Sequence, residues 1–341
     1  MTAPLRIAYL MEDTDLSGGV RVQLAQADAM IARGHRVTIF TKGLPLTWRT
    51  SEAEWEYVDD FRAQAYDEFD FVIATFWTTV EPAFEKAGKR AVHLSQGLES
   101  TFTAYQAIRE DIERAYRLPI PKIVVSPHLI DWLAPFGQEI FVVGQIVDEA
   151  FFRERRPEEH EPLRVLLAGA SQVDFKGIDV GYDAVLHARA AGSDLALVRV
   201  SPWAPSREEP KEAADEFHVG LDAAAMVRLV HSCDVFLGPS RKEEGFGLPA
   251  AEAMAAGIPA VLSRIPSFES FEPHRSDYAV WAEEGDPEAL GDALMRLLDD
   301  PDLREALSIR GRQVAKQYRA ANVAERLEAF LLERRSRAQA K

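Results

Sequence analysis

The fold is decided by residues 239–261, which read Pro-Ser-Arg-Lys-Glu-Glu-Gly-Phe-Gly-Leu-Pro-Ala-Ala-Glu-Ala-Met-Ala-Ala-Gly-Ile-Pro-Ala-Val. The stretch follows an apolar strand predicted over 235–238, and Pro249 is typical of a first helical position. Gly257 ends the predicted helix, and a second strand follows over 260–263. A strand, a glycine loop, a helix and a strand in this order form the repeating unit of a parallel α/β sheet.

The glycine loop of this stretch combines a site for anions with two carboxylates. Backbone N–H groups at a helix N-terminus lack partners within the helix, and the helix dipole favours negative charge there. Glu244 and Glu252, with seven residues between them, would repel a phosphate and need another partner. An ionised carboxylate accepts two O–H donors at once, so sugar hydroxyls are the obvious partners. The combination indicates a nucleotide-sugar; a solvated surface loop before an ordinary amphipathic helix is the structural alternative.

The same stretch closely resembles the Glu-x7-Glu signature of retaining glycosyltransferases of family 4. That family has the GT-B fold, in which two Rossmann-like doubly wound α/β domains face a central cleft. The resemblance implies that Glu252 binds the ribose hydroxyls of the nucleotide, and that Glu244 is a catalytic residue that contacts the hydroxyls of the donor sugar. It also implies that the donor pocket is lined by Gly245, Phe246, Gly247 and Leu248.

The cations that the family uses around the diphosphate are only partly present. Lys176-Gly177 opens a predicted helix where the family has Lys-Gly, and the resemblance gives this lysine the role of neutralising the leaving diphosphate. The family's usual arginine, six residues before the lysine, is Ala170 here. One of two cations that stabilise the leaving group is therefore absent from its usual place. The candidates to replace it, each otherwise interpreted as a surface residue, are Arg241, Lys242 and Arg199.

The first half of the chain offers two further candidate contacts. Gly18 and Gly19 lie between the first predicted strand and the first predicted helix, where a phosphate-facing turn is usual and where family members carry Gly-Gly. Gln96 stands at a strand end where family members have a histidine before a glycine, and its amide is predicted to contact the sugar or the acceptor. Glu99 is a weaker candidate, and His93 is either a contact or a satisfied core histidine.

No metal site or cofactor is predicted. Residues 13–15, Asp-Thr-Asp, match the Asp-x-Asp pattern that binds metal in the other large glycosyltransferase fold, but we interpret them as loop acids near the acceptor side. No His or Cys cluster has the spacing of metal ligands. Lys176 and helix N-termini are expected to act in place of a metal cation. No Gly-x-Gly-x-x-Gly follows the first strand, which argues against a dinucleotide-dependent dehydrogenase.

Two domains are predicted, because 341 residues are too many for one typical domain. Short apolar strands alternate with helices, a polar and charged segment at 153–162 interrupts the alternation, and the pattern then restarts. We expect an N-terminal Rossmann-like acceptor domain over 1–152 and a C-terminal Rossmann-like donor domain over 163–319. By the resemblance, a C-terminal helix over about 320–341 returns to the first domain.

Hydrophobic periodicity predicts the individual elements. The predicted strands are 6–10, 36–41, 71–75, 91–95, 123–126, 140–143, 164–168, 195–200, 235–238, 260–263 and 279–281. The predicted helices are 20–33, 78–88, 99–117, 127–134, 178–190, 223–232, 249–256, and 287 nearly to the end with a restart at Pro301.

Composition bounds the partners and the compartment. A net charge of −16 and a sequence pI near 5.0 argue against nucleic acid as a partner. The single cysteine, Cys233, rules out an internal disulfide framework and is predicted to be buried and inert. No signal pattern begins the chain, and no apolar run approaches the roughly 18 residues of a membrane span. A cytoplasmic location is therefore predicted, with peripheral membrane contact open because some acceptors of the family are lipid-linked.

The preferred function is that of a retaining, metal-independent glycosyltransferase. It would move a sugar, of the hexosyl type, from a nucleoside-diphosphate sugar to a hydroxyl of a carbohydrate or glycoconjugate acceptor. Two alternatives stay open: a nucleotide-sugar binding protein whose catalysis has decayed, as Ala170 suggests, and a nucleotide-sugar epimerase or hydrolase of the same fold. The sequence does not identify the base, the sugar or the acceptor.

Overall fold

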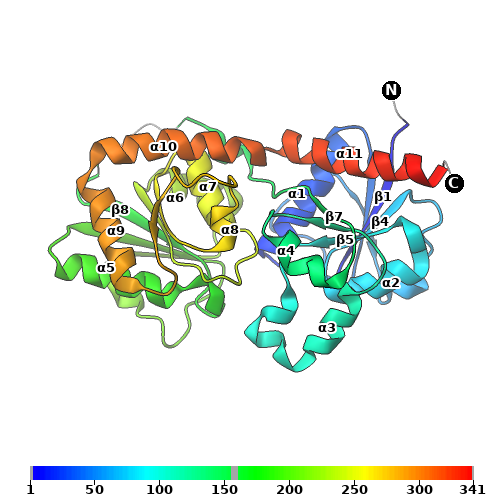
Figure 1. The fold of residues 1–341 in the computed structure, drawn as a ribbon, viewed down its shortest axis with the longest axis horizontal. Coiled ribbons are helices and arrows are strands. Elements are labelled where there is room, and N and C mark those ends of the chain that lie inside the picture. Colours follow the sequence, from blue (N-terminus) through cyan, green and yellow to red (C-terminus); the bar gives the residue numbers. More distant parts are fainter. Residues whose placement is uncertain (1–2, 155–159, 340–341) are drawn as a thin grey trace. The chain divides into compact units, whose positions relative to one another are not determined.

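The computed structural model describes residues 3–154 and 160–339. The chain divides into two compact units: Met1–Ile146 with Tyr318–Lys341, and Val147–Gln317. Each unit contains one parallel sheet flanked by helices (Figure 1). This is the two-domain, Rossmann-like α/β architecture that the sequence predicts.

The first unit is built on a seven-stranded sheet in the order β3-β2-β1-β4-β5-β6-β7, with every neighbouring pair parallel. Its central strands are apolar and buried because helices cover both faces. The strands are β1 (Arg6–Met11), β2 (Arg36–Thr41), β3 (Glu54–Tyr57), β4 (Phe71–Ala74), β5 (Ala91–Ser95), β6 (Lys122–Val124) and β7 (Ile140–Val142).

The helices of the first unit lie on both sides of this sheet. One core packs side chains of β1 and β4 against α2 and α3, and α11 packs on α1. The α-helices are α1 (Gly18–Ala32), α2 (Trp77–Ala87), α3 (Arg109–Tyr116), α4 (Leu129–Leu133) and α11 (Ala320–Gln339). Short 3-10 helices are η1 (Phe61–Ala63), η2 (Gly88–Arg90), η3 (Glu99–Thr101), η4 (Thr103–Ile108) and η5 (Ala134–Phe136).

Helix α11 is fixed to the first unit by apolar packing and by ion pairs. Its Phe330 ring stacks on Phe141 of β7 with 5.2 Å between centroids. Its Glu328 forms ion pairs with Arg33 and with His35, the latter at 3.0 Å. The chain therefore returns to its first unit after completing the second, as Figure 1 shows for the red helix beside α1.

The second unit has a six-stranded sheet in the order β10-β9-β8-β11-β12-β13, again parallel throughout. The strands are β8 (Leu163–Ala168), β9 (Leu195–Ser201), β10 (Glu216–Val219), β11 (Val235–Gly238), β12 (Ala260–Ser263) and β13 (Val280–Ala282). Alternate side chains of β8, β9 and β11 join one core with α5 and α9.

The remaining helices of the second unit complete its layers. The α-helices are α5 (Ile178–Ala190), α6 (Ala223–His231), α7 (Leu248–Ala256), α8 (Pro266–Glu269), α9 (Pro287–Asp299) and α10 (Pro301–Ala315). The 3-10 helices are η6 (Glu149–Phe152), η7 (Asp174–Lys176) and η8 (Lys211–Ala213), while η9 (Lys316–Tyr318) lies at the junction of the units.

Several element boundaries differ from the predictions. Residues 99–117 do not form one helix: two 3-10 turns precede α3, because the stretch from Ser100 to Thr103 is rich in Ser, Thr and Phe, which favour helices weakly. The edge strands β3 and β10 were not predicted, since each is only four residues long, mixes acidic with apolar residues and has no buried side chain. Helix α7 begins at Leu248, one residue before the proline. Helix α11 begins at Ala320, as predicted, and is described to Gln339.

The unit boundary lies earlier than the predicted boundary at 153–162. Helix η6 packs against α6 and α7, and its Phe151 is only 1% exposed, so this segment belongs to the second unit. Residues 155–159 of the predicted linker lie outside the described residues.

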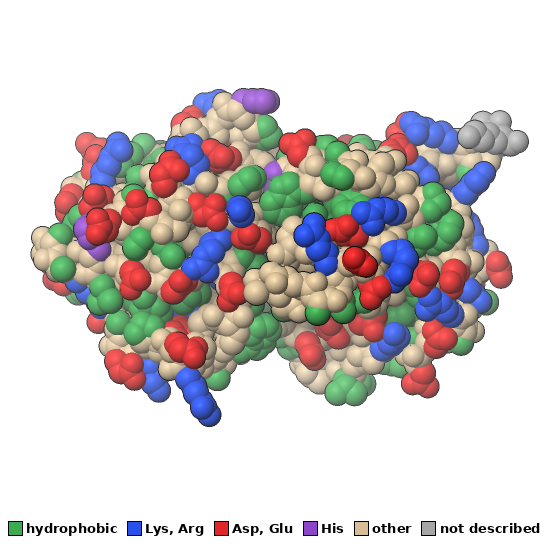
Figure 2. All heavy atoms as spheres, turned by 60° about the horizontal axis from the view of Figure 1, so that its bottom comes forward, with side chains coloured by type: hydrophobic (Ala, Val, Ile, Leu, Met, Phe, Trp, Pro, Cys, Tyr) green, Lys and Arg blue, Asp and Glu red, His purple; other side chains and the backbone are tan. Residues whose placement is uncertain are grey.

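Cys233 is buried, as predicted from the sequence. Burial raises the pKa of the Cys233 thiol to about 12, so the thiol stays protonated at neutral pH. On the face drawn in Figure 2, Asp and Glu side chains are interspersed with Lys and Arg side chains.

Candidate functional site

The first candidate site lies where the strand order of the second unit reverses. Strands β8 and β11 are neighbours in this sheet, but the chain passes through β9 and β10 between them. At such a point the loops after the two strands leave in opposite directions, which opens a crevice at the carboxyl ends of the strands. The loop after β8 carries Lys176, and the loop after β11 carries Glu244.

Lys176 and Glu244 form an ion pair at this point. The distance from Nζ to Oε2 is 2.6 Å, and the side chains are 21% and 7% exposed. The Ser240 hydroxyl also donates to Oε2 at 3.2 Å, and the Gly247 amide donates to Oε1 at 3.2 Å. The carboxylate is thus held by a cation, a hydroxyl and a backbone amide. The structure brings together the two residues that the sequence predicts to be catalytic.

The two loops touch through their backbones. Gly177 has a φ of +59°, and a Cβ atom there would lie 2.0 Å from the carbonyl oxygen of Pro239. Only glycine allows this approach. Arg241 ties the same loops together: its amide donates to Phe175 O at 2.7 Å, and its Nη2 lies 2.6 Å from Asp179 Oδ2. Arg241 thus fixes the turn that presents Lys176.

The Gly-Phe-Gly segment is buried and packed. Gly247 precedes α7 with a φ of +85°, and a Cβ atom there would meet the Phe268 ring at 2.2 Å. The Phe246 ring packs edge-on against Phe271 with 5.2 Å between centroids. A ligand in this loop would therefore meet backbone atoms of Gly245, Phe246 and Gly247 rather than the phenyl ring. Leu248 is 9% exposed.

Glu252 lies on α7 and is 1% exposed. Ala170, at the position of the family arginine, is also buried, at 4% exposed. Lys242 is exposed, and its amide donates to Glu284.

Arg199 is not at the surface, as the sequence had suggested, but lies completely buried on β9. Its Nε donates to Glu209 Oε1 at 2.8 Å, and its Nη1 donates to Leu167 O at 3.3 Å. Burial lowers the pKa of the Arg199 guanidinium. The described contacts of Arg199 do not include Lys176 or Glu244, so it does not join their ion pair.

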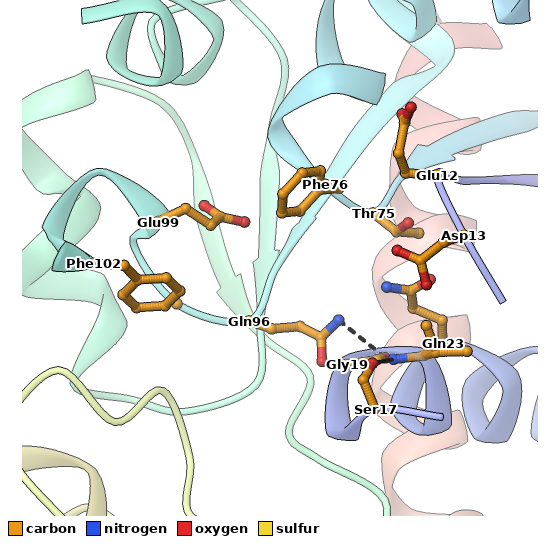
Figure 3. A pocket seen from close by; sticks show the side chains of 12 residues that line it. Glu12, Asp13, Ser17, Gly19, Gln23, Thr75, Phe76, Gln96, Glu99 and Phe102 are labelled. Carbon is orange, nitrogen blue, oxygen red and sulfur yellow. Dashed lines mark hydrogen bonds between the residues drawn. The ribbon is translucent and has the colours of Figure 1, made fainter. Parts of the chain in front are cut away.

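The second candidate site is a cavity of about 230 Å³ in the first unit. It lies where the loops after β1, β4 and β5 meet; β1 and β4 are adjacent strands at which the strand order of this sheet reverses. We call it the Gln96 pocket; six of its lining residues are Glu12, Asp13, Phe76, Gln96, Glu99 and Phe102 (Figure 3).

Gln96 bridges the pocket to the start of α1. Its Nε2 donates to the Gly19 carbonyl at 3.2 Å, the dashed line in Figure 3. A Cβ atom at Gly19 would lie 3.5 Å from this nitrogen, whereas one at Gly18 would have no neighbour within 4 Å. Ser17 caps α1 by accepting from the Val20 amide. Gly19 and Gln96, predicted separately from the sequence, therefore line one pocket.

Glu99 is the most perturbed acid of the pocket. It is 8% exposed, and burial raises the pKa of its carboxyl to about 7. The Tyr116 hydroxyl donates to one of its oxygens. Figure 3 shows the Glu99 carboxyl pointing toward Phe76. His93 lies behind it, fully buried and edge-on to the Tyr116 ring at 4.7 Å, with its pKa lowered by burial.

The raised pKa of Glu99 predicts a pH-dependent stability. Unfolded, the carboxyl ionises near 4.5, but folded it keeps its proton to about pH 7, so wild-type stability falls as pH rises through this interval. The free energy of unfolding of Glu99→Gln, relative to that of wild type, should therefore rise by about 2–3 kcal/mol between pH 5 and pH 8. Urea unfolding of both proteins at the two pH values measures this. If the difference in free energy of unfolding between the two proteins did not change with pH, the pKa of Glu99 would not be raised by folding.

Some pocket residues were not singled out from the sequence. Phe76 and Phe102 form apolar walls, and Tyr116 holds Glu99 from α3. Glu12 pairs with Lys42 at 2.9 Å. The only signal for Phe76 was its place directly after a buried strand. Asp13, interpreted as a loop acid, lines the pocket.

Within residues 3–154 and 160–339, no group of three or more His, Cys, Asp or Glu side chains is arranged to hold a metal ion. Metal independence stays a prediction. No helix in the same ranges combines the length and apolar character needed to cross a bilayer. The predicted cytoplasmic location is untested by this finding.

Residues 208–314, which include the Glu244 loop and α7, match the family described as glycosyl transferases group 1. This match to the glycosyl transferases group 1 family lies entirely within the second unit. Membership of family 4 stays a prediction. The matched segment begins in the connection between β9 and β10 and ends in α10, so it contains Glu244 and Glu252 but not Lys176.

Mannosyltransferases are among the curated proteins to which the chain is similar. The chain is 30% identical over 210 residues to an MMP alpha-(1->4)-mannosyltransferase of Mycolicibacterium hassiacum, covering 59% of this chain and 50% of the relative. It is 28% identical over 158 residues to a phosphatidyl-myo-inositol mannosyltransferase of Mycobacterium leprae, covering 45% and 42%. The chain thus spans about half the length of the curated relatives it matches, or less.

Solved structures confirm the two-domain GT-B fold of the chain. Anabaena Alr3699/HepE in complex with UDP-glucose superposes with a TM-score of 0.77 at 13% identity, covering 96% of this chain and all of that one. A glycosyltransferase from Rickettsia africae gives a TM-score of 0.74 at 13% identity, covering 98% and 99%. At these identities the likeness establishes the fold alone.

Proposed function

We propose that the protein is a retaining glycosyltransferase that moves a hexosyl group from a nucleoside-diphosphate sugar to an acceptor hydroxyl. The Lys176–Glu244 ion pair at the strand-order reversal of the second unit is the observation that carries this proposal. The match of residues 208–314 to the glycosyl transferases group 1 family and the similarity to mannosyltransferases support sugar transfer. The UDP-glucose complex of Alr3699/HepE, a protein of the same fold, supports the class of donor.

In this proposal the loops of the second unit hold the donor. Lys176 neutralises the charge that grows on the departing diphosphate, and the N-terminal amides of α7 add to it. Glu244 accepts hydrogen bonds from the sugar hydroxyls, and Glu252 accepts them from the ribose. Gly245, Phe246 and Gly247 offer backbone atoms, and Leu248 an apolar contact. The ion pair keeps Lys176 and Glu244 oriented before the donor arrives.

Retention follows from the order of bond changes that we propose. The bond between the anomeric carbon and the diphosphate oxygen breaks, which leaves an oxocarbenium-like centre. The acceptor oxygen bonds to that carbon on the same face, and its proton passes to the departing phosphate oxygen. The protein contributes charge stabilisation and positioning, without a nucleophile or a metal ion of its own.

The Gln96 pocket is proposed as the acceptor site. Its aromatic walls can pack against the C–H face of a sugar, while the Gln96 amide and the carboxylates bind hydroxyl groups. Gly19 lines this pocket and Gly18 precedes it at the start of α1, and in this proposal they contact donor phosphate or acceptor.

The buried Ala170 motivates the second candidate, a nucleotide-sugar binding protein that no longer catalyses transfer. Arg241 and Arg199 do not replace the family arginine in the conformation described, because Arg241 pairs with Asp179 and Arg199 with Glu209. This candidate and the preferred one share the donor site and differ only in turnover.

A donor panel tests the proposed function. Uridine, guanosine and thymidine diphosphates are each added in a thermal-shift assay, and we expect one of them to raise the melting temperature by a few degrees. The corresponding nucleotide-sugars are then incubated with a mixture of sugar acceptors, with and without EDTA. We expect release of nucleotide that requires an acceptor and survives EDTA, and a product that keeps the anomeric configuration.

The other outcomes separate the alternatives. Binding without nucleotide release under any condition would indicate the decayed binding protein. Turnover without an acceptor would indicate an epimerase or a hydrolase. No binding of any nucleoside diphosphate would defeat the proposal.

A further inference from the structure

The charges that line the Gln96 pocket all have the same sign. Its titratable lining residues are Glu12, Asp13 and Glu99, and among the described residues no Lys, Arg or His lines it. Such a lining is unusual for a site that receives a phosphate or a carboxylate, where positive side chains or helix N-termini normally face the anion.

These carboxylates differ in how far their charge is compensated. Glu12 is offset by Lys42 at 2.9 Å and accepts a hydrogen bond from Thr78 at 2.6 Å. Asp13 accepts from the Asp15 amide, and Glu99 from the Tyr116 hydroxyl. In the part of the chain that the structure describes, neither Asp13 nor Glu99 pairs with a cation. Asp13, and Glu99 at a pH above its pKa of about 7, therefore present uncompensated negative charge to whatever enters the pocket.

Burial delays the ionisation of Glu99 to about pH 7, but it strengthens the interactions of the charge once the carboxyl is ionised. Glu99 is 8% exposed, its carboxyl points into the pocket in Figure 3, and Phe76 and Phe102 reduce the water around it. An anion placed beside a carboxylate in such surroundings is repelled more strongly than in bulk water. The Gln96 amide and the Ser17 hydroxyl are neutral. The N-terminus of α1 also lines the pocket, at Ser17 and Gly19, but the partial positive charge of a helix N-terminus is only about half an elementary charge, less than that of one carboxylate.

The remaining lining groups fit a hydroxyl-rich ring. Carboxylates accept O–H and N–H hydrogen bonds, the Gln96 side chain both donates and accepts, and the phenyl rings offer flat apolar surfaces. The cavity, about 230 Å³, is of the size class of small-molecule sites.

We propose that the part of the acceptor held in the Gln96 pocket is a hydroxyl-rich ring that carries no negative charge, so that neutral and amine-bearing sugars or cyclitols are taken and their phosphorylated counterparts are refused. The proposal rests on the proposed function, since it names the acceptor class of that site. It separates this chain from the relative named a D-inositol 3-phosphate glycosyltransferase of Corynebacterium urealyticum, to which it is 35% identical over 102 residues.

Direct binding tests the proposal without any transfer reaction. Glucose, glucosamine and glucose 6-phosphate, and the corresponding forms of mannose, are titrated into the full chain to about 50 mM at pH 8, where Glu99 is ionised, and dissociation constants are measured by ligand-observed NMR. In at least one series we expect the neutral sugar and the amino sugar to bind, and the phosphate to bind at least about 30-fold more weakly.

A charge-matched pair of double variants separates charge from size. In Asp13→Asn/Glu99→Gln both side chains keep their shape, and the Gln retains an acceptor for Tyr116. We expect the ratio of the dissociation constants of phosphate and neutral sugar, the gap, to shrink to about 3-fold. In the control Glu56→Gln/Asp59→Asn, two exposed acids outside the pocket are removed, with the same change in net charge, and the gap should persist.

Each other outcome overturns the proposal. Phosphates that bind as tightly as neutral sugars would do so, as would equal gaps in the two double variants, or no binding of any neutral or amino sugar. Because binding is read without donor, loss of the proposed transfer activity would leave these results interpretable. If phosphorylated sugars bound as tightly as neutral ones while the transfer reaction was intact, only this inference would be overturned and the proposed function would stand.

Discussion

The Glu244→Ala variant should lose about 10²–10³-fold or more in transfer rate while it still folds. The carboxylate is proposed to hold the donor sugar hydroxyls, and it fixes Lys176 at 2.6 Å and accepts the Gly247 amide at 3.2 Å. Removing it frees the lysine and loosens the loop before α7. Both effects act where negative charge grows in the reaction. Initial rates with the donor found in the panel measure the loss.

The matched control is Glu243→Ala, one residue earlier. Glu243 is half-buried, with no described partner, so its removal changes the net charge equally but leaves the ion pair intact. We expect near-wild-type rates for this control. Circular dichroism should show both variants folded, because Lys176 is 21% exposed and can be hydrated when its partner is gone. Full transfer activity in the Glu244 variant would refute the assigned role.

Gly177→Ala should lower the free energy of unfolding of the second unit by more than a substitution at a glycine with open space around it. The residue has a φ of +59°, and the new Cβ would lie 2.0 Å from the Pro239 carbonyl oxygen, a backbone atom that cannot turn aside. The left-handed conformation costs about 1–2 kcal/mol for a residue with a Cβ. Separating the two loops adds about 1–3 kcal/mol. Transfer activity should fall as well, because the loops carry Lys176 and Glu244.

Gly285 provides the control for this substitution. It has a φ of +75°, but a Cβ atom there would meet nothing within 4 Å. Gly285→Ala should therefore cost only the conformational part, about 1–2 kcal/mol. Urea denaturation of the two variants gives the difference. Equal losses would mean that the approach of the two loops does not constrain position 177.

The helices and central strands were predictable because their residues carry the signal themselves. Helix α5 runs over Ile178–Ala190 as predicted, since a glycine precedes it and apolar side chains recur with helical spacing. Strand β11 and the last four residues of β8 are continuous apolar runs because both faces of the sheet are covered there. Strands β3 and β10 lie at sheet edges, where polar side chains are tolerated, and their pairing depends on a neighbour far along the chain.

The candidate sites were predictable to different degrees. Lys176 and Glu244 were assigned from a motif, and adjacent parallel strands explain why the loops that carry them meet. Their direct ion pair was not foreseen, because spacing along the chain does not fix how two loops approach. The burial of Arg199 was missed for a similar reason: its partner Glu209 lies on an irregular segment whose path the sequence does not reveal. The walls of the Gln96 pocket come from separate strand ends, so no local pattern marks them.

The return of α11 to the first unit bears on how the chain acquires its structure during translation. The ribosome delivers residues from the N-terminus, and domains generally fold as they emerge. The second unit, Val147–Gln317, is contiguous and can complete its core as soon as it has left the exit tunnel. The first unit cannot complete its packing at that stage, because the partners of Phe141 and His35 lie on α11, which is synthesised after the whole second unit. The half of the molecule synthesised first is thus the half finished last, and its open flank is exposed to chaperones in the meantime.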